Sequence, residues 1–236
     1  DTGSFRELFQ PGLRLALFIA VTLMIFSQIN GVNMILIYTP TMFLEAGLSQ
    51  AKDAILNSIL IYSWILLNTL GAFWLTKRFG RRPILIGGTI AMSIGHLLMF
   101  VSFTYHLSPL LTLLAILVPT GAFTLTLAPV SWIVLSEIFP NRIRGKAMSL
   151  ATGIMFTTSF VVVSVFPGIM SWFKGHYGQP GPTFLIFSAV CLCCSLFVWR
   201  ILPETRGKTL EEIGSTWLKR QPAKQRELSA TGVSGD

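Results

Sequence analysis

Six long apolar segments, separated by short polar connections, constrain this chain more than any other feature of its sequence. Each is long enough to cross about 30 Å of hydrocarbon as an α-helix that rises about 1.5 Å per residue. A spanning helix satisfies its own backbone hydrogen bonds, and none of the segments shows the alternation of a membrane β-strand. We therefore predict an all-α membrane protein. Its six helices are expected at residues 13–43, 54–75, 83–105, 109–135, 147–173 and 182–202.

Composition and charge agree with a membrane setting. Charged residues make up 12% of the chain, about half the share in a soluble domain. The net charge of +8 comes from short basic clusters without interleaved aromatic residues, which argues against nucleic-acid binding. Of the 18 lysines and arginines, only Lys52 and Lys174 fall on one side of the predicted bundle. This asymmetry predicts that both termini are cytoplasmic, in a plasma membrane or cell inner membrane.

The parts outside the bundle of residues 13–202 are predicted from their polarity. Residues 1–12 form a cytoplasmic lead-in, and a first residue Asp1 in place of Met suggests a piece of a longer protein. Residues 203–220 place Leu210, Ile213 and Trp217 at helical spacing, which favours a cytoplasmic amphipathic segment over a plain linker. Residues 221–236 are polar and are predicted to be a disordered tail.

Nothing in the sequence predicts an enzyme, a cofactor or a metal site. The chain has no Walker-type glycine-rich loop, so ATP is not implied. Its three cysteines lie within one apolar segment without zinc-site spacing, which favours simple packing. The three histidines are scattered; His96 lies in the third segment, where a packed, hydrogen-bonded histidine is favoured over a proton carrier.

The first segment holds four polar residues within seven positions: Ser27, Gln28, Asn30 and Asn33. Polar groups are costly in lipid, so they usually face the interior of a bundle. Gln28 and Asn33 lie about 140° apart around an ideal helix and share a broad face. Their amides offer the donors and acceptors that sugar hydroxyls require. We favour a binding site here over hydrogen bonding between helices, which is the alternative.

The fourth segment carries Pro119 and Pro129, followed by Trp132. Proline kinks a helix, and transporters use interrupted helices near their binding sites. The Trp132 ring could stack on the apolar face of a sugar, or it could be an interfacial tryptophan. At the end of this segment, Glu137 lies near several arginines in the sequence. A partly buried acid should form ion pairs, and such pairs could act as a conformational latch.

Several motifs together resemble the sugar porter family of the major facilitator superfamily, which holds the glucose facilitators and the bacterial proton-coupled sugar symporters. The first matches are Gln28-Ile-Asn-Gly-Val-Asn33 and Arg78-Phe-Gly-Arg-Arg82. The later ones are Pro129-Val-Ser-Trp132, Ser136-Glu-Ile-Phe-Pro140, Ile143-Arg-Gly-Lys146 and Pro203-Glu-Thr-Arg-Gly-Lys-Thr-Leu-Glu-Glu-Ile213. The resemblance implies the carboxy-terminal six-helix half of a transporter built from two such halves.

The family resemblance also implies roles for particular residues. Gln28, Asn33 and Trp132 would bind a monosaccharide, with Phe123 and Asn68 in the same pocket and Tyr38 at the external gate. The cytoplasmic charge network would comprise Arg81, Arg82, Glu137 and Arg144, with Glu204 and Arg206 at its edge. The implied partners are the sugar, possible coupling protons, the lipid bilayer and the amino-terminal half.

Four positions depart from the family pattern. Ser27 replaces a glutamine, Ile65 replaces an asparagine with Asn68 one turn further on, and Met155 replaces a polar residue. Lys77 replaces the acid before the Arg78–Arg82 motif, which would loosen the latch. The less polar pocket leaves several functions open: facilitated diffusion or proton symport of a sugar, transport of another polyhydroxylated solute, a sugar sensor without transport, or a partial transporter.

Overall fold

The computed structural model describes residues 5–10, 13–45 and 51–204, and within them every regular element is helical. Six spans are long and apolar enough to cross a membrane, as predicted. The first and fourth spans are each made of more than one element. In chain order the elements are η1 (Phe5–Phe9), α1 (Arg14–Ile29), α2 (Val32–Glu45), α3 (Ala51–Arg78), α4 (Arg81–Thr104), α5 (Pro109–Ala122), the π-helical η2 (Phe123–Leu127), α6 (Ala128–Ile138), α7 (Asn141–Tyr177) and α8 (Thr183–Ile201).

The first span is interrupted between α1 and α2. Gly31 adopts φ +89°, a left-handed conformation that ends the α1 hydrogen-bond ladder. The Asn30 side chain bridges the interruption: its Nδ2 donates to the carbonyls of Phe26 and Ser27, and its Oδ1 accepts from the Val32 N–H at 3.0 Å. The prediction of one continuous helix over residues 13–43 was therefore wrong at its middle.

The fourth span changes its helical geometry near its middle. Between α5 and α6, the chain widens into the π-helical turn η2 over Phe123–Leu127. The Ala128 N–H donates to the Phe123 carbonyl across this wider turn. Pro129 has no N–H, so the widened turn lies where the regular ladder could not continue unchanged.

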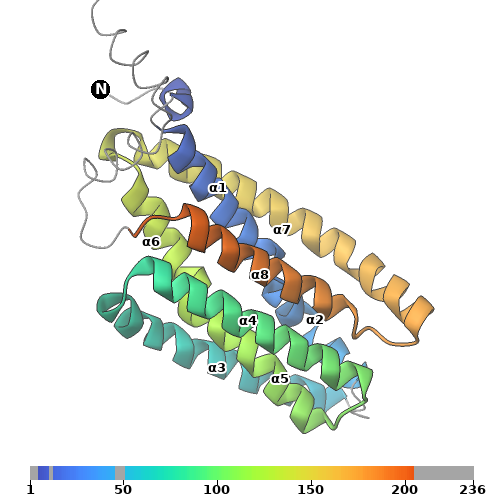
Figure 1. Ribbon diagram of the computed structural model, residues 1–236. Coiled ribbons are helices and arrows are strands. Elements are labelled where there is room, and N and C mark those ends of the chain that lie inside the picture. Colours follow the sequence, from blue (N-terminus) through green and yellow to red (C-terminus); the bar gives the residue numbers. More distant parts are fainter. Residues whose placement is uncertain (1–4, 11–12, 46–50, 205–236) are drawn as a thin grey trace, which may run out of the picture.

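The bundle is held together mainly by α4, which packs against α8 on one side and α5 on the other, while α1 packs against α7 (Figure 1). Two buried hydroxyl pairs reinforce the α4 contacts: Ser93 with Ser188 of α8, and Ser102 with Thr112 of α5, both at 2.7 Å. The apolar core forms two clusters, one around Leu23 and Val134 and the other around Phe166 and Phe184.

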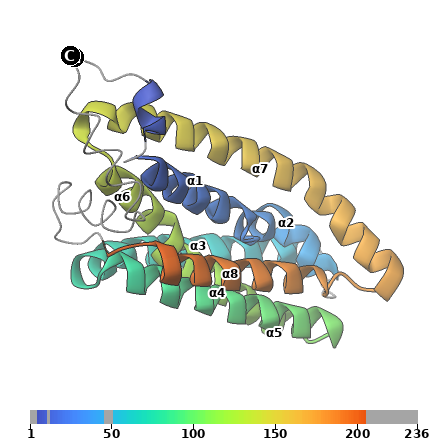
Figure 2. The same ribbon diagram turned by 45° about the horizontal axis from the view of Figure 1, so that its top comes forward.

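Two of the six spans remain largely uncovered. Only 11% of the most apolar window of Ile55–Arg78 and 6% of that of Asn141–Tyr177 are buried, against 39–61% in the other four spans. Figure 2 shows α7 along one side of the bundle. A half of a larger helical protein would leave such faces for lipid or for its other half.

The turns with most of the basic residues meet at one end of the bundle, which we call the basic end. It contains the α3–α4 and α6–α7 turns, joined by Arg81 and Glu137, together with η1 and Glu204. An even number of spans places both ends of the bundle and every second turn on the same side, as the predicted topology requires. Residues 205–236, which include the predicted amphipathic segment and tail, lie outside the described residues.

Candidate functional site

The interruption of the first span brings together the two amides predicted to bind substrate. Gln28 lies in the last turn of α1 and Asn33 in the first turn of α2, and the Asn33 Nδ2 donates to the Gln28 Oε1 at 2.8 Å. The Gln28 Nε2 in turn donates to the Ser27 Oγ at 3.2 Å. Both amides are half-buried, so part of each remains open to the surface of this half. The result is a pre-organised pair of carboxamides that spans the break.

The other two polar residues of this segment have structural roles. Ser27 is buried and its Oγ donates to the Met24 carbonyl at 2.7 Å. Asn30 is buried and its side chain bridges the helix ends, as described above. Of the four polar residues that suggested a binding site, two therefore serve the local backbone, and Gln28 and Asn33 remain as candidates.

The other residues predicted to bind substrate, on α3, η2 and α6, differ in how exposed they are. The Trp132 side chain of α6 is 39% exposed, which leaves a broad ring surface uncovered. Asn68 of α3 is half-buried, and its Nδ2 donates to the Trp64 carbonyl of the same helix at 2.8 Å. Phe123 lies in the π-helical turn and is only 8% exposed within the core. Its position therefore favours packing within this half over contact with a substrate.

Sequence reasoning overlooked Trp64, one turn before Asn68. Its indole Nε1 donates to the Leu117 carbonyl of α5 at 2.9 Å, and its side chain is 38% exposed. Gly121 permits this approach, because a Cβ there would lie 2.6 Å from the Trp64 Nε1. The sequence feature that could have drawn attention to Trp64 is its position one helical turn before Asn68, a predicted polar site residue.

Tyr38, the predicted gate residue, lies on α2. Its ring packs against Phe166 of α7, with centroids 5.2 Å apart and planes at 42°. The Tyr62 hydroxyl of α3 donates to the nearby Leu36 carbonyl at 3.3 Å. Tyr38 thus packs between α2, its own helix, and α7 through its ring contact with Phe166, and its gate role stays a prediction.

Among the described residues, no hydrogen bond connects the Gln28–Asn33 pair with Trp132 or Asn68. An apolar cavity of about 360 Å³ lies elsewhere, lined by α3, α4 and the fourth span, including Leu75, Gly87 and Leu125. None of the predicted substrate residues lines it. The predicted substrate residues of α1, α2, α3 and α6 are therefore not gathered around this cavity, and a common site for them stays a prediction.

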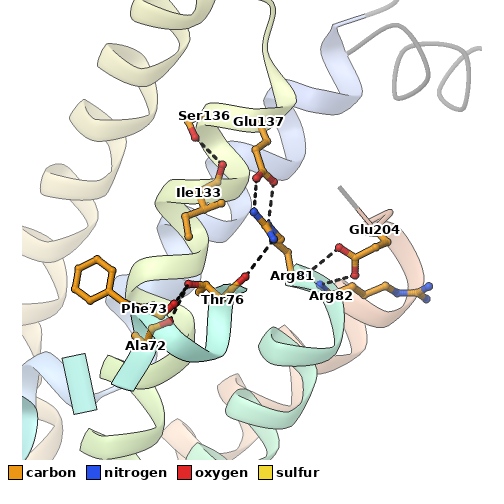
Figure 3. Close-up of polar contacts among 9 residues, drawn as sticks. All are labelled: Ala72, Phe73, Thr76, Arg81, Arg82, Ile133, Ser136, Glu137 and Glu204. Carbon is orange, nitrogen blue, oxygen red and sulfur yellow. Dashed lines mark hydrogen bonds and ion pairs between the residues drawn. The ribbon is translucent and has the colours of Figure 1, made fainter. Parts of the chain in front are cut away.

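The charge network at the basic end centres on Arg81, as Figure 3 shows. Its guanidinium makes two hydrogen bonds to the Glu137 carboxylate, at 2.7 and 3.2 Å. A third bond reaches the Thr76 carbonyl at 3.3 Å. The two side chains are 16% and 28% exposed, so water screens this bidentate pair less than a surface pair. The predicted Arg81–Glu137 contact is present although Lys77 replaces the family acid.

Glu204 has a more central position than its predicted place at the edge of the network. Its two carboxylate oxygens accept from the backbone N–H groups of Arg81 and Arg82, at 2.9 and 3.2 Å. These are unsatisfied donors at the N-terminus of α4, where negative charge is stabilising. Gly80 leaves room for this cap, because a Cβ there would lie 2.2 Å from the Glu204 Oε2. Glu204 therefore ties the end of α8 to the start of α4.

Two arginines of the predicted network bind carbonyls. The Arg144 guanidinium donates to the Phe139 carbonyl at 3.4 Å, and Arg82 donates through Nη2 to the Trp199 carbonyl. The Arg144 side chain folds back over the α6–α7 turn, and its place in the charge network stays a prediction. Arg142 instead pairs with Glu7 of η1 at 2.8 Å, a contact that sequence spacing did not reveal. Arg206 lies outside the described residues.

Replacing Glu137 by Gln is expected to destabilise the basic end. The Glu137→Gln variant keeps the side-chain shape but leaves the Arg81 charge partly buried without its counter-charge. Loss of hydrogen bonds to a charged group should cost about 2 kcal/mol. The matched control is Arg142→Gln, which breaks an ion pair whose arginine is 60% exposed and should cost about 0.5 kcal/mol. Thermal unfolding of the full-length protein would measure both; equal effects would contradict this interpretation of the Arg81–Glu137 pair.

Known proteins resemble this chain in both sequence and structure. Residues 1–217 match the family described as "Sugar (and other) transporter". A D-xylose-proton symporter of Escherichia coli strain K12 is 36% identical over 201 residues, covering 84% of this chain and 40% of the relative. An arabinose-proton symporter of Bacillus subtilis strain 168 is 34% identical over 218 residues, covering 92% of this chain and 46% of the relative.

Solved structures give the same result. A proton:xylose symporter, XylE, bound to 6-bromo-6-deoxy-D-glucose superposes with a TM-score of 0.78 at 34% identity, covering 90% of this chain and 46% of that one. An inward open conformation of the xylose transporter from E. coli gives a TM-score of 0.70 at 31% identity, covering 85% and 42%. The chain thus spans less than half the length of these relatives. With its six-span helical fold and its match over residues 1–217, the chain belongs to the sugar (and other) transporter family of the major facilitator superfamily.

Proposed function

We propose that this chain is the carboxy-terminal half of a secondary transporter that moves a monosaccharide by alternating access. The amino-terminal half would cover the exposed faces of α3 and α7 and complete the substrate cavity. The observation that carries the proposal is the carboxamide pair of Gln28 and Asn33 across the break in the first span. The names of the xylose and arabinose symporters support a pentose or hexose as the substrate.

The binding chemistry follows from the groups available. Gln28 and Asn33 together offer amide donors and carbonyl acceptors to sugar hydroxyls, and Trp132 offers a flat ring to the apolar face of the sugar. Asn68, on the neighbouring α3, would extend this polar surface. Tyr38 would close the external side by moving with α2. The Arg81–Glu137 pair would hold the basic end in one conformation and separate in another.

We also propose how the bundle is oriented in the membrane. The basic end would face the cytoplasm, so that both termini are cytoplasmic in a plasma membrane or cell inner membrane. Residues 203–220 would then follow the last span on the cytoplasmic side, and residues 221–236 would form a polar tail. Protons are proposed as the coupling ion because both curated relatives named above are proton symporters. The coupling carboxylate would belong to the amino-terminal half.

The test is counterflow of labelled solutes by the full-length protein in liposomes. The panel should contain xylose, arabinose, glucose, a polyol and an organic acid. Exchange of a monosaccharide above the background of empty liposomes is the expected result. Binding without exchange would instead favour a sensor, and exchange of only the polyol or the organic acid would overturn the proposed substrate class.

The Trp132→Ala variant is expected to lower the efficiency of exchange. Loss of the ring face should cost about 1–2 kcal/mol of sugar binding, which corresponds to about a tenfold higher KM. The matched control is Trp199→Ala, which removes an exposed tryptophan of α8 near the basic end. Initial rates of counterflow at several sugar concentrations would measure both variants. Equal KM values for Trp132→Ala and the wild type would remove Trp132 from the proposed site.

A further inference from the structure

His96 is a buried polar residue without a hydrogen-bond partner. It lies on α4, its side chain is fully buried, and neither Nδ1 nor Nε2 has a partner among the described residues. Sequence reasoning favoured a packed and hydrogen-bonded histidine; the packing is confirmed, and within residues 5–10, 13–45 and 51–204 the ring makes no hydrogen bond of ordinary geometry. Because an unsatisfied buried polar group costs about 1–3 kcal/mol, native proteins rarely keep one without a reason.

The surroundings of His96 include the break in the first span. The ring lies close to the backbone of Asn30, although no hydrogen bond of ordinary geometry forms between them. The Phe187 ring of α8 is 5.6 Å from the His96 ring, centroid to centroid. The same phenyl ring also packs on Gly31, where a Cβ would lie 2.4 Å from its Cγ. His96, Phe187 and the Asn30–Gly31 turn therefore meet at one place.

The Asn30 carbonyl lacks a good donor at this place. The left-handed Gly31 interrupts the helix ladder, and among the described residues no backbone N–H donates to this oxygen. Its contact is with the Cys191 Sγ at 3.9 Å, and a thiol is a weak donor. A buried acceptor and a buried imidazole, each poorly satisfied, thus lie next to each other at the break between α1 and α2.

We infer that His96 is a positioning residue for the substrate amides: its imidazole N–H donates to the Asn30 carbonyl in one conformation of the break and releases it in another. The angle between α1 and α2 fixes how Gln28 and Asn33 stand relative to each other, because each lies on a different side of the break. The hydrogen bond requires only a neutral imidazole, so no proton is transferred. This inference rests on the proposed transport function.

The experiment compares variants of the full-length transporter that differ in the donor at position 96. His96→Leu removes the donor at similar volume, whereas His96→Asn and His96→Gln each retain an amide N–H. The control is Ser93→Ala, which removes a buried hydrogen bond between α4 and α8 one turn away. If His96→Leu does not fold, His96→Phe replaces it, because it keeps a ring against Phe187. The readouts are KM and maximal rate of counterflow, and hydrogen–deuterium exchange of residues 31–35.

His96→Leu is expected to raise KM about fivefold, the value of one hydrogen bond, and to speed amide exchange in residues 31–35. At least one of the two amide variants should restore KM to within about twofold of the wild type, and Ser93→Ala should leave KM unchanged. A wild-type KM in His96→Leu, or equal losses in the leucine and both amide variants, would overturn the inference.

The exchange measurement separates this inference from the proposed function. If the wild-type protein transports no solute of the panel, the proposed function fails, but hydrogen–deuterium exchange still tests His96. Faster exchange of residues 31–35 in His96→Leu and not in Ser93→Ala would support the positioning role. Unchanged exchange in His96→Leu would contradict it.

Discussion

Replacing Gly31 by Ala is expected to destabilise the protein strongly. The residue adopts φ +89°, which costs an L-residue about 1–2 kcal/mol. The new Cβ would also lie 2.4–2.8 Å from three ring carbons of Phe187. That ring cannot move freely, because it is 7% exposed and stacks against Phe166 with centroids 5.8 Å apart. Adding the cost of overpacking, we expect a total loss of about 3 kcal/mol.

The measurement is the midpoint of thermal unfolding of the purified full-length protein. Gly87→Ala is the matched control, since Gly87 lies within α4 and a Cβ there would meet no atom within 4 Å. Alanine in a helix interior is favoured over glycine, so this control should unfold at the same or a slightly higher temperature. Equal midpoints for the Gly31 variant and the wild type would show that the left-handed conformation of Gly31 and its packing against Phe187 do not limit stability.

Replacing Gln28 by Ala is expected to have the largest effect on substrate binding. The change removes an amide that would meet the sugar, and it also removes the acceptor that holds the Asn33 Nδ2 at 2.8 Å. Two weakened hydrogen bonds of about 1 kcal/mol each should raise KM more than tenfold. Concentration-dependent counterflow by the full-length protein would measure the change. A suitable control is Thr89→Val, which removes a buried hydroxyl that bonds only within α4.

A double-mutant cycle would test whether the two amides act together. Because Gln28 and Asn33 are in contact, the Gln28→Ala and Asn33→Ala effects on KM should be less than additive by about 1 kcal/mol, or about fivefold. Fully additive effects would contradict a pre-organised pair and would favour two independent contacts with the substrate.

The six spans could be predicted because the requirement that fixes them is local. Each segment must be apolar over its own length and must satisfy its own backbone in lipid, and both conditions are visible in the sequence. The interruption at Gly31 depends on a distant residue. A glycine at position 31 is compatible with a continuous helix, and its left-handed conformation accompanies the close packing of Phe187, which lies on the last helix.

In the candidate site, too, residue types could be predicted from the sequence, whereas contacts that depend on the folded chain could not. The residue types of Gln28 and Asn33 suggested a polar site, but a straight helix would place them about 140° apart. Only the break allows the 2.8 Å contact between them. At the basic end, charge and position predicted the Arg81–Glu137 pair. Which acceptor an arginine reaches depends on how turns fold, so neither the Phe139 carbonyl bound by Arg144 nor the Glu7 partner of Arg142 could be predicted.

The most direct measurement is a structure of the full-length protein with a bound monosaccharide that it exchanges. We expect the sugar against the surface of α1, α2 and α6, with hydroxyls within hydrogen-bond distance of the Gln28 and Asn33 amides and the Trp132 ring against its apolar face. A sugar bound away from these three residues, or the three side chains turned toward lipid, would contradict the account.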